Sequence, residues 1–237
     1  MTETKAEYEG KAKQIVGTDD PSVVIQRFKN SATAFNGKKY AEFEGKGRLN
    51  NAISSFVFQK LEAAGVPTHF IERAGDIDMR VKRLQIVPLE VVVRNIVAGS
   101  LAQRTGLDEG TKLAKPIVET YYKRDDLGDP LLAETHVEML GLATREELDY
   151  MFELARKVNE VLSNAMEAAD LVLVDFKLEF GRDAEGKILL GDEISPDTCR
   201  LWDRETQRKM DKDVFRRDLA DLVEVYEEVA SRLGVEV

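Results

Sequence analysis

The stretch Leu171-Val172-Leu173-Val174-Asp175-Phe176-Lys177-Leu178-Glu179-Phe180-Gly181 carries the clearest pattern in the sequence. Side chains alternate between the two faces of a β-strand, so Asp175, Lys177 and Glu179 share one face and apolar side chains take the other. A strand with one solvated face explains this alternation as well as a functional site does. The segment 187–194 is also apolar, and we expect it to return beside the first strand as a hairpin.

Asp192 lies on the apolar side of that second strand. A buried carboxylate must be protonated, paired or metal-bound, because burying it bare costs far too much free energy. If the turn covers 182–185 and Gly181 pairs with Gly186, Asp192 falls opposite Asp175, although a slip of one residue would remove the coincidence. The carboxylates of both strands would then converge beside a lysine, and such oxygen ligands suit Mg²⁺ that bridges substrate phosphates.

The composition restricts the class of protein. The chain has 237 residues, of which 43% are hydrophobic and 33% charged, a balance typical of a globular protein with a sizeable core. Asp and Glu number 44 against 34 Lys and Arg, and the resulting net charge of −10 disfavours a nucleic-acid binder. The single cysteine, Cys199, indicates a reducing compartment and is interpreted as a packing residue rather than a nucleophile.

Residues 1–13 lack the apolar region of a signal peptide, and no apolar run is long enough to span a bilayer. We therefore expect a cytoplasmic protein without a membrane partner. His69 and His136 stand alone in the sequence, without the spacing of metal ligands, and are interpreted as structural.

The first part of the chain reads as short strands around one helix. Residues 31–47 contain three glycines and are expected to form a loop. Helical spacing of apolar residues predicts a helix over 48–64. Strands are predicted at 12–17, 23–28, 68–73 and 78–85.

The second part combines a valine-rich strand at 88–94 with longer helices. A polar connection follows that strand. A helix is predicted over 145–168, where Thr144 and Glu147 form a capping box at its start. A closing helix is predicted over 213–233.

Strands interleave with only a few long helices, and hairpins outnumber β-α-β units. We therefore expect an α+β fold. The chain would form two lobes, 1–85 and 86–237, with a hinge near residues 82–88 and a cleft between the lobes.

Two further groups of residues suggest phosphate binding. Lys11 and Lys13 follow Gly10 on one strand face and could lie over phosphates, although lysine pairs on edge strands also serve solubility. Neither a P-loop nor a dinucleotide-binding glycine pattern occurs. Arg94, with Ser100 after a glycine, could also hold a phosphate.

An internal ion pair between Glu90 and Arg94 explains the second group equally well, because both side chains share a face of the valine-rich strand. Arg200 follows the carboxylate strand in an irregular segment, and it could close on the same ligand.

These same residues resemble a known family. The segment 87–100 resembles the first signature of the SAICAR synthetase family, and 173–181 resembles its second. Further segments, in the order and spacing of the family, are 8–13, 191–197, 200–203 and 210–216. The pair Thr198-Cys199 departs from the small residues usual there and leaves Arg200 intact.

The resemblance, which covers essentially the whole chain, implies a two-lobed fold related to ATP-grasp enzymes, with the active site in the cleft between the lobes. It also implies an ATP-dependent ligase of purine biosynthesis. This enzyme joins L-aspartate to the carboxylate of the nucleotide CAIR and releases SAICAR, ADP and phosphate. A homodimer is expected by the same analogy.

The resemblance also implies roles for individual residues. In the N-terminal, nucleotide-binding lobe, Gly10, Lys11 and Lys13 would lie over the ATP phosphates, and Lys82, Arg83 and Leu84 would supply backbone partners for adenine. In the C-terminal lobe, Glu179 and Asp192 would hold Mg²⁺. CAIR would be surrounded by Arg94, Ser100, Asp175, Lys177, Arg200, Lys212 and Arg216. The implied catalytic residues are Lys13, Asp175 and Lys177.

Two segments, 35–47 and 123–129, are candidates for binding the substrate L-aspartate. The glycines of the first segment suggest a lid over the site. Two other functions remain open. A small-molecule kinase of the same architecture would share the lysines and the metal carboxylates, whereas a regulatory nucleotide-binding module would not need those carboxylates.

Overall fold

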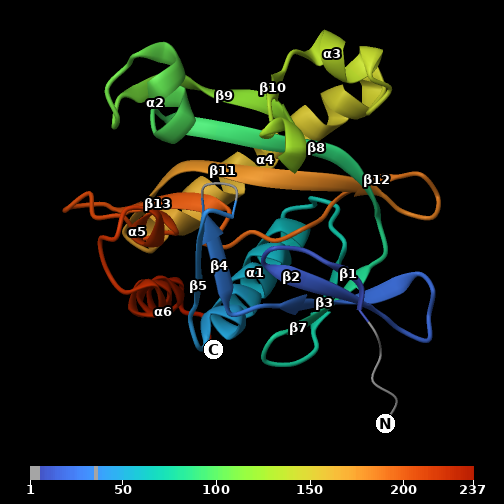
Figure 1. Ribbon diagram of the computed structural model, residues 1–237, viewed down its shortest axis with the longest axis horizontal. Helices are drawn as coiled ribbons and strands as arrows, with labels where there is room; N and C mark the ends of the chain where they lie inside the picture. The colour runs from blue at the N-terminus through green and yellow to red at the C-terminus, as the bar shows by residue number, and fades with distance from the viewer. Residues whose placement is uncertain (1–5, 35–36) are drawn as a thin grey trace.

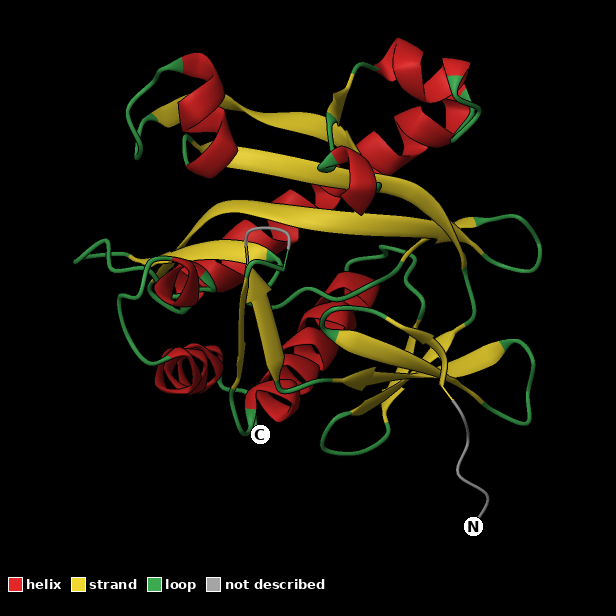
Figure 2. Cartoon of the chain, viewed as in Figure 1, coloured by secondary structure: helices red, strands yellow, loops and turns green. Residues whose placement is uncertain are grey.

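The computed structural model describes residues 6–34 and 37–237, which form two larger antiparallel sheets with helices packed on them (Figures 1 and 2). The first sheet has the strand order β1 (Ala6–Glu9), β2 (Lys13–Gly17), β3 (Val23–Phe28), β7 (Asp78–Lys82) and β6 (Phe70–Arg73). Helix α1 (Lys46–Ala63) packs against this sheet. The strands and the helix predicted for this part of the chain are confirmed within a few residues of their expected ends.

The loop predicted over 31–47 is wrong, because part of this segment forms the hairpin of β4 (Ser31–Ala34) and β5 (Lys39–Glu42). Its glycines lie outside the strands. Gly37 has a φ of 82° beyond the first strand, and Gly45 has a φ of 87° immediately before α1. The glycines therefore mark the ends of regular structure, not its absence. Residues 35 and 36 of the predicted aspartate segment lie outside the described residues.

The second sheet lies above the first in Figure 1 and has β11 (Leu171–Arg182) near its centre. Its order is β10 (Leu131–Leu132), β9 (Lys112–Tyr122), β8 (Gln85–Ile96), β11 and β12 (Ile188–Leu190), and β13 (Cys199–Asp203) also pairs with β11. Helix α4 (Arg145–Ala168) packs on β11 and β8. The short helices of this part are α2 (Gly99–Thr105), η1 (Asp125–Leu127) and α3 (Glu134–Met139).

The polar connection predicted after the valine-rich strand is wrong over β9, which pairs along most of β8. Pro116 and two lysines, Lys112 and Lys115, make the segment read as a connection, since proline cannot donate to a sheet. The β-branched and aromatic residues at 117–122 were the signal for a strand. This strand matters for function because Glu119 and Tyr121 lie on it.

The hairpin of β11 and β12 exists, but its predicted register is wrong. Gly181 pairs with Leu189 rather than Gly186, because the turn lies further along the chain. The Asp183 carboxylate caps that turn by accepting the backbone N–H groups of Glu185 and Lys187, each at 2.9 Å. Asp192 therefore does not face Asp175.

The closing helix predicted over 213–233 is also wrong, because it is broken into α5 (Asp213–Arg216) and α6 (Leu222–Leu233). Asp221 accepts the backbone N–H of Val223 at 2.8 Å and that of Glu224 at 3.1 Å, so it caps α6. Leu219 falls in the break and is 56% exposed. The cap at Asp221 therefore starts a new helix there, although the apolar spacing in the sequence predicts one continuous helix.

One continuous set of buried side chains connects both sheets and the long helices, and it includes Phe58 of α1, Leu148 of α4 and Tyr226 of α6. The α+β class is confirmed. The division at residue 85 stays a prediction; β7 ends at Lys82 and β8 begins at Gln85. No helix within the described ranges 6–34 and 37–237 is long and apolar enough to cross a membrane.

The capping box of α4 gives a test of local stability. Thr144 accepts the Glu147 backbone N–H at 3.2 Å, and the Glu147 carboxylate accepts the Thr144 N–H at 2.9 Å. We expect Thr144→Ala to lower the free energy of unfolding by about 1 kcal/mol, because a backbone donor loses its partner. Urea unfolding measures the change, and Thr144→Ser, which keeps the hydroxyl, should lose much less. Equal losses in both variants would contradict the role of the cap.

Candidate active site

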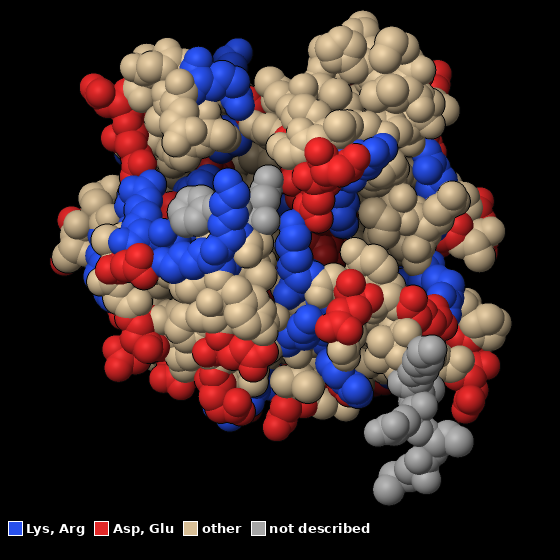
Figure 3. Space-filling view, viewed as in Figure 1, with Lys and Arg blue, Asp and Glu red and all other residues tan. Residues whose placement is uncertain are grey.

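A cavity of about 720 Å³ lies between the two sheets. All of the predicted site residues except Ser100 line it. Its described lining includes ten Lys and Arg against eight Asp and Glu, so the cavity is locally positive in a chain whose net charge is −10. Figure 3 shows Lys and Arg gathered across the middle of this face, around its hollow. A cavity of this charge favours an anionic small ligand.

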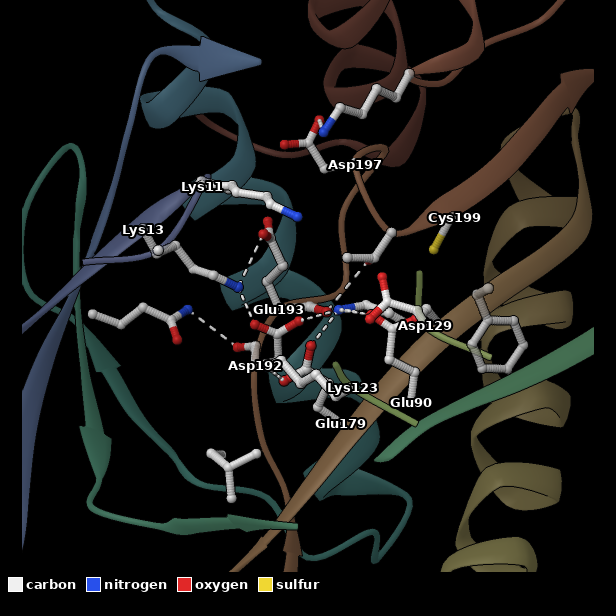
Figure 4. A pocket seen from close by; sticks show the side chains of 18 of the residues that line it. Lys11, Lys13, Glu90, Lys123, Asp129, Glu179, Asp192, Glu193, Asp197 and Cys199 are labelled. Carbon is white, nitrogen blue, oxygen red and sulfur yellow. Dashed lines mark hydrogen bonds and ion pairs between the residues drawn. The ribbon is translucent and has the colours of Figure 1, made fainter. Parts of the chain in front are cut away.

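One wall of the cavity holds a lysine cluster, which we define as Lys13, Lys123 and Lys177 with the carboxylates that they contact. Lys13 of β2 points between Asp192 and Glu193 (Figure 4); its Nζ bonds Asp192 and lies 3.0 Å from Glu193 Oε1. Strand β11 supplies the other side of the cluster.

Within the cluster, the Lys177 ammonium group contacts carboxylates from three parts of the second sheet: Glu90 on β8, Glu179 on β11 and Asp192 after β12. Its Nζ lies 3.0 Å from Asp192 Oδ2 and 3.8 Å from Glu90 Oε1, and it also bonds Glu179. Lys123 bonds the second carboxylate oxygen of Glu179. The predicted gathering of Lys177, Glu179 and Asp192 is therefore present, although Asp175 takes no part in it.

Mutual attraction favours the charged forms of Lys13 and Asp192. Burial by itself lowers the pKa of Lys13, but Asp192 and Glu193 outweigh burial and raise that pKa above its ordinary value. Burial raises the pKa of Asp192, but Lys13 and Lys177 outweigh it and hold the pKa well below its usual range. Charged groups packed this closely can exchange partners for ligand charges without a change in protonation.

The side chains that could bind a metal ion are few. Within residues 6–34 and 37–237, no group of three or more His, Cys, Asp or Glu side chains is placed to hold a metal ion. Asp192 and Glu179 are nevertheless joined through the single Nζ of Lys177, and both line the cavity as hard oxygen donors. One or two carboxylates, together with water and substrate phosphates, are what Mg²⁺ usually takes. The residues therefore fit Mg²⁺ bound with a phosphorylated ligand, but not a metal held by protein alone.

The adjoining wall, further along the same face of β11, holds an arginine chain, in which carboxylates and guanidinium groups alternate. The Asp175 carboxylate of β11 accepts Arg94 Nη1 at 3.0 Å and Arg200 Nη1 at 2.9 Å. These arginines lie on β8 and β13, the two strands that flank Asp175. In order, the members of the chain are Glu119, Arg94, Asp175, Arg200, Asp213 and Arg216.

Arg94 is the most enclosed arginine of the chain, with 3% of its surface exposed. Its guanidinium donates to Glu119 at 2.7 Å and, at 3.0 Å, to both Ser100 Oγ and the Tyr121 hydroxyl. The ion pair considered between Arg94 and Glu90 does not form; Glu90 faces Lys177 instead. The structure thus links Arg94 to Ser100, as predicted, but most of its donors already have protein partners.

Behind the arginine chain lies Asp211, which has no exposed surface. Its carboxylate accepts the backbone N–H of Leu201 at 2.8 Å and that of Asp213 at 2.7 Å. Burial and the neighbouring charge of Asp213 raise the pKa of Asp211 to about 7. Nothing in the local sequence pattern distinguishes this carboxylate from a surface one.

The segment predicted to contact adenine lies where β7 passes into β8. The Arg83 guanidinium bonds Glu7 at 2.6 Å and the Pro21 carbonyl at 2.7 Å, so it is engaged away from the cluster of lysines. His69 is buried against the Phe58 ring at 5.1 Å, and burial lowers its pKa to about 3. His69 is therefore neutral, and it lines the cavity as well as packing in the core.

Cys199 is buried in the cavity wall, and burial raises the pKa of its thiol. A thiol held protonated in this way does not act as a nucleophile, which agrees with the packing role expected from the sequence.

Sequence reasoning missed a buried group around Asp197. Lys46, which has no exposed surface, lies 2.5 Å from Asp197, and the Tyr226 hydroxyl donates to Asp197 at 2.7 Å. Lys212 lies 3.9 Å from the same carboxylate. Because Asp197 lines the cavity, this group ties α1 and α6 to the wall that carries Lys212.

The second segment predicted for aspartate contributes Lys123, Asp125 and Asp129 to the cavity lining. Lys11 bonds Asp125 at 2.6 Å, across 114 positions of sequence. This contact joins the first sheet to the connection between β9 and β10.

The fold and the cavity define a class of protein: an α+β protein with a cavity whose lysine and arginine side chains suit a small anionic ligand. The sequence model of the SAICAR synthetase family matches residues 6–233. The phosphoribosylaminoimidazole-succinocarboxamide synthase of Anoxybacillus flavithermus is 58% identical over 96% of this chain and 95% of its own length. The chain belongs to the SAICAR synthetase family.

Solved structures agree with that assignment. The crystal structure of phosphoribosylaminoimidazole-succinocarboxamide synthase from Ehrlichia chaffeensis has a TM-score of 0.96 and 45% identity, covering 98% of this chain and 100% of its own. A SAICAR synthetase in complex with ADP has a TM-score of 0.93 and 51% identity, covering 95% of this chain and 96% of its own. The resemblance inferred from the sequence is confirmed.

Asp211 predicts a pH dependence of stability. Its folded pKa, about 7, lies above the ordinary value of a carboxyl group, so the stability it contributes is lost as the pH rises toward 7. In Asp211→Asn, we expect the free energy of unfolding to fall less between pH 5 and pH 8 than in the wild type, by roughly 2 kcal/mol. Urea unfolding at both pH values measures the difference. Parallel changes in the two proteins would contradict the assignment.

Proposed function

We propose that the chain joins L-aspartate to the carboxylate of CAIR at the expense of ATP and forms SAICAR, ADP and phosphate in purine biosynthesis. The observation that carries this proposal is the cavity, in which the lysine cluster and the arginine chain lie side by side along β11 in a member of the SAICAR synthetase family. Two charged walls are what a reaction between two phosphorylated substrates requires, since each needs its own counter-charges.

The lysine cluster suits the phosphates of ATP. Lys11 and Lys13 belong to the same strand region as Gly10, and all three line the cavity. A relative with 51% identity has been solved with ADP, which supports the nucleotide as a co-substrate here. The adenine ring is assigned to the segment 82–84, at the passage from β7 to β8. Glu179 and Asp192 would hold Mg²⁺, which when bound neutralises charge on the phosphates.

The arginine chain suits CAIR. Arg200, Lys212 and Arg216 all line this wall, and a guanidinium can bind a phosphate through two N–H groups. Asp175 keeps Arg94 and Arg200 in fixed positions between two strands. In this assignment Arg94 acts mainly by holding Ser100 and Asp175, because most of its donors are already bound.

The chemistry explains why both walls are needed. A carboxylate is a poor acyl donor because oxide is a very poor leaving group. Transfer of the γ-phosphoryl group of ATP to a carboxylate oxygen of CAIR forms an acyl phosphate and ADP. The amine of aspartate then attacks the acyl carbon, the C–O bond to the phosphate breaks, and phosphate leaves. The protein's part is chiefly positioning and charge neutralisation, with Lys13 and Lys177 at the transferred group.

The site for aspartate stays a proposal for the segments 35–47 and 123–129. In the second segment, Lys123 and Asp129 line the cavity beside Glu179. Lys123 offers a cation for a carboxylate of aspartate, and Asp129 offers an acceptor for its amine.

The runner-up function is a small-molecule kinase, which would use the same lysines and carboxylates. A kinase forms a stable phosphorylated product without an amino acid, whereas the ligase does not. The deciding experiment measures ADP release with CAIR alone, aspartate alone and both together. Stoichiometric SAICAR and ADP only with both substrates is expected; steady ADP formation without aspartate would overturn the ligase assignment.

The homodimer and the location in the cytoplasm stay predictions. Size-exclusion chromatography with light scattering tests the first: a mass of two chains is expected, since one chain is 26.7 kDa. The elution of a single chain at micromolar concentration would contradict it.

The metal assignment predicts the effect of removing each carboxylate. We expect Glu179→Gln and Asp192→Asn each to lower kcat at least about 100-fold, because the charge that holds Mg²⁺ is lost. The assay is SAICAR formation at saturating ATP and Mg²⁺. Glu185→Gln, on the exposed turn of the same hairpin, is the matched control and should behave as the wild type. Retained activity in both site variants would contradict the assignment.

A further inference from the structure

Asp213 belongs to the arginine chain, but it does not line the cavity and is not among the site residues predicted from the sequence. Its side chain is 2% exposed at the first residue of α5. One carboxylate oxygen accepts Arg200 Nε at 3.1 Å, and the other accepts Arg216 Nη1 at 2.5 Å. Both arginines line the cavity, so this one buried carboxylate holds two guanidinium groups of the same wall.

Asp213 and Asp175 hold Arg200 from two sides. Nε is directed to Asp213 and Nη1 to Asp175, so Nη2 is left for other partners. A Cβ atom placed on Gly99 would lie 2.5 Å from Nη2, and Gly99 has a φ of 52°. The free edge of the guanidinium therefore lies against the glycine that precedes Ser100, where a bulkier residue could not fit.

The backbone around Asp213 is itself fixed. Asp211 accepts the N–H groups of Leu201 and Asp213, and Leu201 is the neighbour of Arg200 on β13. The distance between the strand of Arg200 and the carboxylate of Asp213 is thus set by two buried hydrogen bonds. Such rigidity lowers the entropy lost when a ligand binds.

A third arginine, Arg217, also contacts Asp213 but lies outside the cavity lining, so its loss tests whether a broken ion pair to Asp213 is by itself enough to change substrate binding. Arg217 lies 3.5 Å from Asp213 and 2.9 Å from Glu109, is 40% exposed and does not line the cavity. It shares the carboxylate but could not touch a ligand in the cavity. Arg217 therefore provides a matched control for loss of an ion pair to Asp213.

We propose that Asp213 is a positioning residue that aims Arg200 and Arg216 at the phosphate group of the CAIR nucleotide. The inference rests on the proposed function. With Asp213 in place, Arg200 bonds protein carboxylates through Nε and Nη1 and keeps Nη2 for the ligand, and Arg216 bonds Asp213 through Nη1 alone. Without Asp213, Arg200 keeps only Asp175 as a charged partner and Arg216 loses its own. Both side chains would then become ordered only when the substrate binds, which lowers affinity.

The test is the kinetics of Asp213→Asn, which keeps the size of the side chain and removes its charge. The KM for CAIR should rise about ten-fold or more, while the KM values for ATP and aspartate stay within about two-fold of the wild type. The 5′-dephosphorylated nucleoside of CAIR is the matched substrate. Its kcat/KM should not change between wild type and variant, because the phosphate is absent.

Controls keep the outcome decisive. Arg217→Ala should leave all three KM values unchanged. If Asp213→Asn fails to fold by circular dichroism, Asp213→Glu replaces it; that variant keeps the charge but displaces it, and a rise of about three-fold or more in the KM for CAIR is expected. An unchanged KM for CAIR in a folded variant, an equal rise for all substrates, or an equal loss on the dephosphorylated substrate would overturn the inference. Absence of SAICAR formation by the wild type would instead overturn the proposed function.

Discussion

The structure depends on one constraint: the central strand β11 carries charged side chains on a face that the fold buries. Asp175 is 4% exposed and Glu179 is 3% exposed. An unpaired carboxylate at such a position would cost several kcal/mol, so neighbouring elements must supply cations. Arg94 and Arg200 come from the strands on either side of β11, and Lys13 comes from the first sheet. The pairing of these charges therefore also fixes how the two sheets meet.

The two walls solve this constraint differently. In the arginine chain, Arg94 and Arg200 are each held by two carboxylates, so the positions of these planar groups are fixed before any ligand arrives. In the lysine cluster, flexible ammonium groups share carboxylates and can turn to new partners. The difference suits the proposed reaction, in which the nucleotide carboxylate must be held still while phosphoryl charge moves past the other wall.

The sequence predicted the composition of the site better than its arrangement. The alternation in 171–181 correctly placed Lys177 and Glu179 on one face, and a lysine did prove to join the carboxylates of the hairpin. The prediction that Asp192 lies opposite Asp175 is wrong because β12 ends at Leu190, before Asp192. The φ of Asp192 is 59°, which lies outside strand geometry. Glu119 and Asp197 gave no local signal, since their partners lie on other segments, and the contact of Asp213 with Arg200 likewise joins two segments. Such residues become visible only when the fold brings the segments together.

The lysine cluster also links the proposed binding of nucleotide and metal. Lys13 and Lys177 contact the carboxylates that Mg²⁺ would need, so lysine and metal compete for the same oxygen atoms. Phosphates of a nucleotide attract the ammonium groups and leave those oxygens available for a cation. Two carboxylates alone give a weak metal site, which agrees with the lack of a third donor within the described residues 6–34 and 37–237. Metal and nucleotide should therefore bind as a unit, and the cluster should keep its charge balance both before and after binding.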